Sequence, residues 1–139
     1  MTWTLHPQLE HDTASLGDLP LSRVLVMNDT NYPWLILVPR KAGITEIIDL
    51  DESEQAQLMT EITRAARALR EVTVCHKLNV AALGNVVAQL HVHVVARQTH
   101  DAAWPRPVWN VGARIAFAPD ALRTRLARLR TALRIESEA

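Results

Sequence analysis

The most informative pattern in this chain lies at residues 89–95, which read Gln89-Leu90-His91-Val92-His93-Val94-Val95. Polar side chains alternate there with aliphatic ones, and the β-branched valines favour an extended backbone. Successive side chains of a strand point to opposite faces, so Gln89, His91 and His93 are predicted to share one face, spaced about 7 Å apart. Burying three hydrogen-bonding side chains on an apolar strand is unfavourable unless they have partners, so the pattern indicates a functional site.

Three interpretations of this pattern are open from the residues alone. The first is a half-exposed antiparallel strand, because alternation by itself requires no function. The second is a metal site on His91 and His93, which would require a further ligand such as the distant His76 or His100. No metal is assigned, because no third ligand lies nearby in the sequence. The third is nucleophilic catalysis, in which a neutral imidazole attacks phosphorus and its neighbours donate hydrogen bonds to phosphoryl oxygens.

The segment resembles the signature of the histidine triad (HIT) family of nucleotide hydrolases and transferases, His-φ-His-φ-His-φ-φ, in which φ is apolar. The chain keeps the second and third histidines as His91 and His93 and has Gln89 in place of the first. The resemblance implies that His91 is the catalytic nucleophile, which becomes transiently nucleotidylated, and that His93 contacts phosphate. Gln89 is expected to donate its amide N–H to a phosphate oxygen, although glutamine cannot be protonated near neutral pH.

Further binding residues follow from the same resemblance. Asn85, in the Gly84-Asn85 turn, and Asn79, in the strand before it, match positions that contact phosphate. Asn28, at the end of an earlier strand, and its neighbour Asp29 match the position that binds the ribose of the nucleoside. The alternative for Asn85, Asn28 and Asp29 is turn chemistry, in which asparagine and aspartate are common.

The implied reaction has two steps and no cofactor. His91 displaces a leaving group from the α-phosphorus, and water then hydrolyses the nucleotidyl-imidazole to a nucleoside monophosphate. The expected substrates are dinucleoside polyphosphates, nucleoside phosphoramidates or related nucleotide conjugates. Because Gln89 replaces a group that can carry a proton, we expect a preference for leaving groups that need little protonation. Two other classes stay open: a nucleotide-binding sensor or scaffold with slow turnover, and a small metal-binding protein that uses His91 and His93.

Composition limits the possible partners and location. The 139 residues are expected to form a single domain over residues 1–139, and the formal net charge of zero provides no general attraction for nucleic acid or a membrane surface. Cys75 is the single cysteine, which excludes an internal disulfide. The first residues lack the pattern of a signal peptide, so a cytoplasmic protein is expected. The HIT resemblance further implies a homodimer.

The expected order of the central elements is strand-strand-helix-strand-strand, with helices segregated from strands. Strands are predicted over residues 21–27, 34–39, 77–83 and 87–97, and residues 16–20 are predicted to form a turn. His6 is expected to be a surface or capping histidine, and the Pro7 that follows it predicts the start of a short helix. A C-terminal helix is predicted over residues 119–135, with its many arginines on a solvated face.

The central helix has the clearest pattern. Asp51 and Glu54 form a capping-box sequence at its start, and Glu61 is expected on its polar face. One apolar stripe follows the helical period: Leu58, Ile62, Ala65, Leu69 and Val72. The order of elements predicts an α+β domain, an antiparallel sheet with one long helix packed on it plus the C-terminal helix. The HIT fold implied by the resemblance has the same arrangement, and the resemblance covers residues 21–109.

Overall fold

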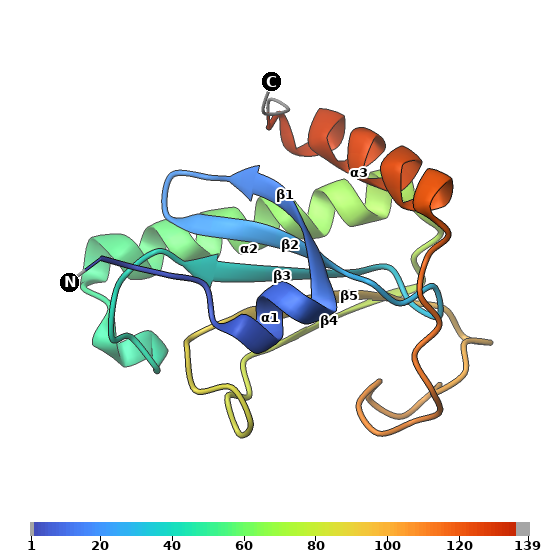
Figure 1. Ribbon diagram of the computed structural model, residues 1–139, viewed down its shortest axis with the longest axis horizontal. Coiled ribbons are helices and arrows are strands. Elements are labelled where there is room, and N and C mark those ends of the chain that lie inside the picture. The colour runs from blue at the N-terminus through green and yellow to red at the C-terminus, as the bar shows by residue number, and fades with distance from the viewer. Residues whose placement is uncertain (1, 136–139) are drawn as a thin grey trace.

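The chain folds around one antiparallel sheet of five strands in the order β1-β2-β3-β5-β4 (Figure 1). The computed structural model describes residues 2–135. Its elements in chain order are α1 (Pro7–Asp12), β1 (Thr13–Asp18), β2 (Ser22–Met27), β3 (Trp34–Pro39), the 3₁₀ helix η1 (Ile47–Asp49), α2 (Glu52–Val72), β4 (Lys77–Ala81), β5 (Val92–Arg97) and α3 (Pro119–Leu133). The predicted α+β class, with one long helix and a C-terminal helix, is confirmed.

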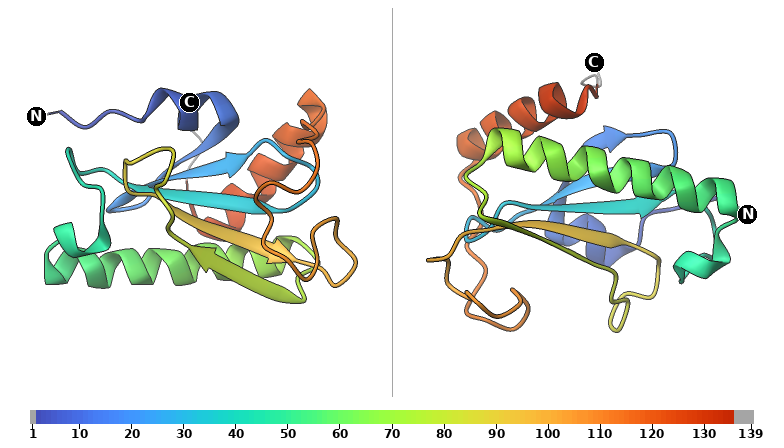
Figure 2. Two further views of the ribbon diagram at one scale, coloured as in Figure 1. Left: turned by 90° about the horizontal axis from the view of Figure 1, so that it is seen from below. Right: turned by 180° about the vertical axis from the view of Figure 1, so that it is seen from behind.

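The two faces of the sheet are covered by different parts of the chain. α2 lies across one face, and the N-terminal segment with α1 lies on the opposite face (Figures 1 and 2). α3 packs against α2 and the edge strand β1. Within residues 2–135, no helix has the length and apolar character that a membrane span requires.

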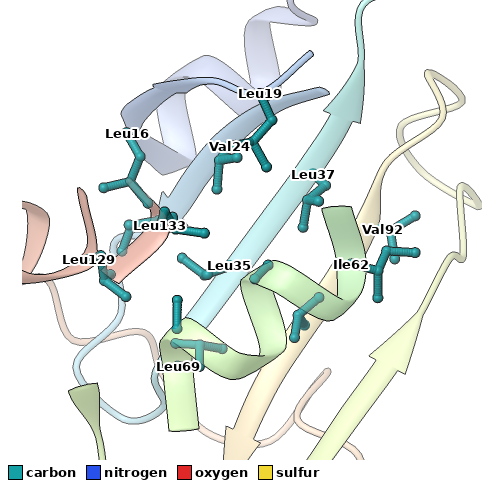
Figure 3. Packing of buried hydrophobic residues seen from close by; sticks show 14 of the residues in the cluster. Leu16, Leu19, Val24, Leu35, Leu37, Ile62, Leu69, Val92, Leu129 and Leu133 are labelled. Atoms are coloured by element: carbon teal, nitrogen blue, oxygen red, sulfur yellow. The ribbon is translucent and has the colours of Figure 1, made fainter. Parts of the chain in front are cut away.

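The face beneath α2 forms the main hydrophobic core (Figure 3). The predicted stripe of α2 supplies buried side chains to it, and so do the alternate residues of β2, β3 and β5. The capping box is also confirmed, because Asp51 accepts a hydrogen bond from the backbone N–H of Glu54, and Glu54 accepts one from that of Asp51. Each fully buried leucine or isoleucine contributes about 1.5–3 kcal/mol to folding, so this face supplies most of the apolar stabilisation.

The opposite face carries a second, more aromatic cluster, and the site lies in it. Its buried members are Leu9, Leu25, Tyr32, Trp34, Ile36, Val38, Val87, Val95, Ala103 and Val108. They come from α1, the central strands, the β2–β3 loop and the loops on either side of β5, so this face joins segments that are far apart in the sequence.

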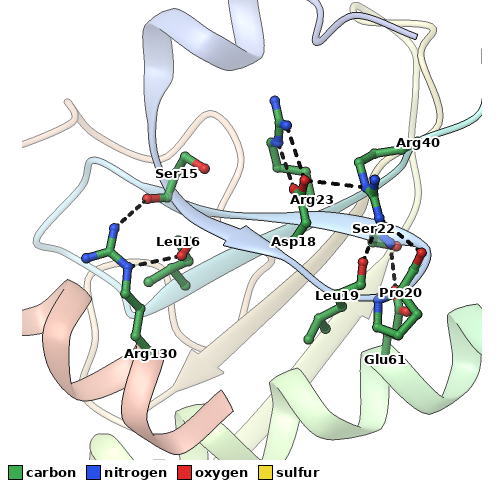
Figure 4. A network of polar contacts seen from close by, with 10 residues as sticks. All are labelled: Ser15, Leu16, Asp18, Leu19, Pro20, Ser22, Arg23, Arg40, Glu61 and Arg130. Carbon is green, nitrogen blue, oxygen red and sulfur yellow. Dashed lines mark hydrogen bonds and ion pairs between the residues drawn. The ribbon is translucent and has the colours of Figure 1, made fainter. Parts of the chain in front are cut away.

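Glu61 corrects the expected polar face of α2. Its side chain is 0% exposed, and one carboxylate oxygen accepts a hydrogen bond from the backbone N–H of Ser22 at 2.8 Å (Figure 4). The other accepts one from the backbone N–H of Leu21, also at 2.8 Å. Gln57 donates its side-chain amide to the same carboxylate. The prediction was wrong because helical periodicity ranks positions by hydropathy and does not show that a turn of the sheet presents two unpaired N–H groups to this position.

The turn predicted over residues 16–20 was also wrong in part, because β1 continues to Asp18. A β-bulge between Ser15 and Gly17 interrupts the alternation that would have indicated a strand. Gly17 has φ +126°, and a Cβ atom there would lie 2.6 Å from Cγ2 of Ile135. Arg130 of α3 donates to the carbonyl oxygens of Leu16 and Ser15, which ties α3 to this irregular edge (Figure 4).

The strand predicted over residues 87–97 begins later than expected, at Val92. Val92 pairs with Leu37 at the last rung of the β3–β5 ladder. In an antiparallel register Leu90 would oppose Pro39, which has no backbone N–H to donate. The backbone N–H of Leu90 instead donates to the carbonyl of Ile44 at 3.0 Å, so the residues before Val92 form a connecting segment.

We predict that Glu61→Gln lowers the free energy of unfolding by about 1–3 kcal/mol, because the amide keeps one acceptor oxygen and turns N–H donors toward a backbone N–H. Urea denaturation monitored by tryptophan fluorescence measures the change. Glu71→Gln, at an exposed position of the same helix, is the matched control and should change the midpoint little. Equal midpoints for the two variants would contradict the assigned role of Glu61.

Candidate functional site

His91 lies in the segment that leads into β5 and is 6% exposed. Its Nδ1 lies 2.7 Å from the backbone carbonyl oxygen of Gln89. A carbonyl oxygen only accepts hydrogen bonds, so Nδ1 carries the proton and the neutral ring has its lone pair on Nε2. Burial lowers the pKa of His91; the Gln89 hydrogen bond opposes this effect, and the nearby His6 adds to it. His91 is therefore neutral at pH 7, with Nε2 available as a nucleophile.

His93, in β5, has the opposite tautomer. The indole Nε1–H of Trp34, which is a donor only, donates to Nδ1 of His93 at 3.0 Å. Burial, together with a smaller contribution from the neighbouring His91, lowers the pKa of His93 to about 4. Neutral His93 therefore carries its proton on Nε2, and this N–H is a hydrogen-bond donor at pH 7.

The two imidazoles meet edge to face, with ring centres 4.9 Å apart and planes inclined by 71°. The predicted common face for His91 and His93 is thus observed, although only His93 belongs to a strand. One ring offers a lone pair and the other an N–H. This pair of groups suits a phosphoryl centre, because one ring can attack phosphorus while the other donates to a non-bridging oxygen.

Two tryptophans enclose His93. Its ring centre lies 5.6 Å from that of Trp34 and 5.0 Å from that of Trp109, and the two indoles are 5.7 Å apart. These contacts exclude water from the imidazole, which is the physical cause of its lowered pKa. Trp34 was expected only as part of a central strand. Its role depends on the β3–β5 register, for which the sequence has no local signal.

A cavity of about 250 Å³ opens beside His91. Its other lining residues come from the segment around η1 and from the β4–β5 connection: Thr45, Glu46, Ile47, Ile48, Ala82, Leu83, Gly84 and Leu90. Gly84 of the predicted Gly84-Asn85 turn therefore lines the same cavity as His91, whereas the adjoining Asn85 is exposed and does not line it.

A second cavity of about 250 Å³ is bordered by the same two indoles. Trp34 and Trp109 line it together with Asp29, which was predicted to bind ribose. The Asp29 carboxylate also accepts hydrogen bonds from the backbone N–H groups of Asn31 at 3.0 Å and Ile115 at 3.3 Å. Asp29 therefore both shapes its turn and faces a space large enough for part of a ligand.

Asn28 has a structural partner as well. Its side-chain oxygen accepts a hydrogen bond from the backbone N–H of Phe117 at 2.9 Å, and it does not line either cavity. Together with Asp29 it binds the segment between Trp109 and α3 to the β2–β3 turn. The turn interpretation therefore accounts for the contacts of Asn28.

Gln89 connects the N-terminal segment to the site. Its amide Nε2 donates to the carbonyl of Thr4 at 2.8 Å, and its Oε1 accepts from the backbone N–H of His6 at 2.9 Å. Its own backbone carbonyl accepts from His91. The amide that was expected to donate to phosphate thus has partners in the protein.

Asn79, on β4, belongs to a buried ionic network. Its Oδ1 accepts from Arg97 at 2.9 Å, and Arg97 makes two hydrogen bonds to Asp101 at 2.8 and 2.9 Å. Arg97 is 1% exposed and also stacks over Tyr32 and Trp104. This network closes the loop after β5, and Asn79 does not line the cavity beside His91. Arg97 and Asp101 are only four residues apart, whereas Asn79 reaches Arg97 through the pairing of β4 with β5, for which the sequence has no local signal.

The metal interpretation lacks a ligand set in the described part of the chain. Among residues 2–135, no group of three or more histidine, cysteine, aspartate or glutamate side chains has the spacing of a metal site. His76 and His100, the distant candidates for a further ligand, contact each other with ring centres 6.4 Å apart.

Comparison with known proteins identifies one family. The profile of the HIT domain matches residues 8–100. The crystal structure of a histidine triad protein from Bradyrhizobium japonicum is 58% identical and has a TM-score of 0.93, over 96% of this chain and 99% of that one. The histidine triad protein of Sinorhizobium meliloti is 43% identical, with a TM-score of 0.92 over 94% of this chain and 97% of that one.

A curated relative has a named activity. An AP-4-A phosphorylase of Mycobacterium tuberculosis is 36% identical over 81 residues, which are 51% of this chain and 41% of that protein. The match therefore spans less than half of that relative's length.

We predict a stability loss in weak acid that depends on His93. The folded-state pKa of about 4 lies below the ordinary 6.5, so protonation favours the unfolded chain. His93 leaves the free energy of unfolding at its full value above pH 6.5. As the pH falls from 6.5 toward 4, its protonation in the unfolded chain lowers that free energy, by about 3 kcal/mol in total. Urea unfolding at pH 7 and at about pH 4.5 measures this dependence.

His93→Gln is the informative variant, because its amide oxygen can still accept from Trp34 but cannot be protonated in this range. It should show a weaker pH dependence than the wild type, whereas His100→Gln, at an exposed position, should show the wild-type dependence. Parallel pH dependences for wild type and His93→Gln would refute the assignment.

Proposed function

The chain belongs to the HIT domain family, and on that premise we propose that it is a nucleotide hydrolase or nucleotidyl transferase acting through a nucleotidyl-histidine intermediate on His91. The reaction takes place at the α-phosphate of dinucleoside polyphosphates or nucleoside phosphoramidates. The observation that carries the proposal is the pair of complementary tautomers, a lone pair on Nε2 of His91 beside an N–H on Nε2 of His93.

In the first step, Nε2 of His91 attacks the α-phosphorus. The P–N bond forms, and the bond to the leaving group breaks with its electron pair staying on the leaving atom. His93 donates its Nε2–H to a non-bridging oxygen, which stabilises the charge that develops there. The Gln89 carbonyl accepts from Nδ1–H of His91 and so stabilises the positive charge on the nucleotidylated ring.

In the second step, an acceptor attacks the nucleotidyl-imidazole and releases His91. Water as the acceptor produces a nucleoside monophosphate. The M. tuberculosis relative is named an AP-4-A phosphorylase, so we include inorganic phosphate as a second acceptor and diadenosine tetraphosphate as the first substrate to test.

Binding of the nucleoside is assigned to the cavity lined by Asp29, Trp34 and Trp109. Indole faces and edges favour contact with a base, and the carboxylate can accept from ribose hydroxyls. Phosphate is assigned to the cavity beside His91, with Asn85 at the exposed turn as a further donor.

One observation favours a second candidate, a nucleotide-binding sensor or scaffold with slow turnover. The amide of Gln89 is bound to the N-terminal backbone, so the first position of the triad provides no group that can protonate a leaving group. In that case the protein would bind nucleotide without releasing product at a useful rate.

We predict that wild-type protein mixed with diadenosine tetraphosphate or an adenosine phosphoramidate gains the mass of one nucleotidyl group and releases AMP or, with phosphate present, ADP. Intact-protein mass spectrometry and product chromatography measure both. His91→Ala should lose the adduct and the products, since the nucleophile is removed. His100→Ala, at an exposed histidine, is the matched control and should retain both.

Each result separates the candidates. Binding of nucleotide by calorimetry with neither adduct nor product would exclude the hydrolase and support the sensor. Product formation by His91→Ala at the wild-type rate would exclude His91 as the nucleophile.

We further propose that two copies pair through the edge strand β4, as the HIT resemblance implies. β4 ends the sheet, and the apolar side chains of Val80, Leu83 and Val86 on and after it are exposed. An unpaired strand edge with exposed apolar side chains is a template for pairing with another chain.

We predict that light scattering coupled to gel filtration reports a dimer for wild type and a monomer for Val80→Lys, because a charge on the paired edge opposes association. Val74→Lys, at an exposed position outside β4, is the control and should remain dimeric. A monomeric wild type would refute pairing through this edge.

A further inference from the structure

The N-terminal segment carries a histidine that the proposed mechanism does not use. The segment lies on the same face of the sheet as the site (Figures 1 and 2), and Gln89 binds it at Thr4 and His6. The same Gln89 binds His91 through its backbone carbonyl. The main-chain carbonyl of Gln89 therefore binds His91, and the side chain of Gln89 binds the backbone of His6.

The contacts of His6 determine which of its nitrogens is free. His6 is the N-cap of α1, and its Nδ1 accepts a hydrogen bond from the backbone N–H of Gln8 at 3.0 Å. Nδ1 is therefore unprotonated, and the neutral ring carries its proton on Nε2. The residue is exposed, so this N–H is open to a ligand. His6 is also close enough to His91 to contribute to lowering the pKa of His91.

We propose that His6 takes the place of the missing first histidine of the triad, with its Nε2–H donating a hydrogen bond to the leaving group that His91 displaces. Gln89 is then a positioning residue, which keeps the N-terminal segment beside the nucleophile. This inference rests on the proposed nucleotidyl transfer at His91 and adds a residue from outside the signature to that reaction.

The step balances without proton transfer from His6. The bond between phosphorus and Nε2 of His91 forms, the bond from phosphorus to the leaving oxygen breaks, and its electron pair stays on that oxygen. The His6 hydrogen bond stabilises the new negative charge while the proton remains on His6. Its effect is therefore largest for a leaving oxygen with localised charge and smallest for one whose charge is delocalised. It is absent from the second step, in which the imidazole of His91 leaves.

The test compares His6→Asn with wild type on two substrates, diadenosine tetraphosphate and the 4-nitrophenyl ester of AMP. Asparagine is a good N-cap, so the start of α1 is kept while the imidazole N–H is removed. His11→Asn is the matched control, because His11 is an exposed histidine of the same helix. Thermal unfolding of each variant establishes that it is folded.

We expect His6→Asn to slow nucleotidylation by diadenosine tetraphosphate about tenfold to a hundredfold, with a much smaller effect on the nitrophenyl ester. Rapid mixing followed by mass spectrometry measures the formation and the breakdown of the adduct separately. The breakdown rate should equal that of wild type. The effect should appear in kcat more than in KM, because the hydrogen bond strengthens as charge develops.

Gln89→Ala tests the positioning role. Without the amide the N-terminal segment is no longer held, so this variant should show the same dependence on the leaving group. The double variant with His6→Asn should be no slower than the more impaired single variant, because both changes remove one interaction. Additive losses would overturn the positioning role of Gln89.

The outcomes separate this inference from the proposed function. A wild-type protein that forms neither adduct nor product overturns both. An active wild type with His6→Asn indistinguishable from His11→Asn overturns the role of His6 and leaves the proposed function standing. An equal loss on both substrates also overturns it, because the hydrogen bond should matter less when the charge on the leaving oxygen is delocalised. A slower breakdown of the adduct overturns it as well, because a leaving-group donor acts on the first step only.

Discussion

The pairing of β3 with β5 is the constraint on which the site depends. Its register places Ile36 opposite His93 and Trp34 opposite Val95, so that Trp34 and His93 lie diagonally on one face and the indole N–H reaches the imidazole. A shift of one residue would turn His93 toward α2 and break this hydrogen bond. The tautomer of His93, and with it the donor beside His91, is therefore a consequence of strand register.

One face of the sheet forms the main hydrophobic core, and the opposite face carries the candidate site. The face beneath α2 is almost wholly apolar and includes one buried carboxylate, Glu61, whose oxygens bind the backbone of the β1–β2 turn. The opposite face carries two buried imidazoles, and burial disfavours the charged form of each. The apolar face offsets the free-energy cost of keeping His91 and His93 dehydrated, and the site gains neutral rings with defined donor and acceptor atoms.

The glutamine at the first position of the signature changes what that position does. An imidazole there would be a titratable group; the Gln89 amide instead binds the backbone of Thr4 and His6, and so holds the N-terminal segment against the loop before β5. The main-chain carbonyl of the same residue keeps its contact with His91. Side-chain identity at this position thus alters the surroundings of His91 without altering the hydrogen bond that sets its tautomer.

Local patterns in the sequence determined β2, β3, α2 with its cap, the two terminal helices and the pair His91 and His93, because alternation, apolar runs and capping depend on near neighbours. They missed the bulged strand β1 and the burial of Glu61. Only the tertiary structure decided which nitrogen of His93 carries the proton and that the N-terminal segment with His6 lies against Gln89. The first depends on the pairing of β3 with β5, which brings Trp34 to His93, and the second on the packing of the N-terminal segment against the loop before β5. Neither contact follows from spacing along the chain.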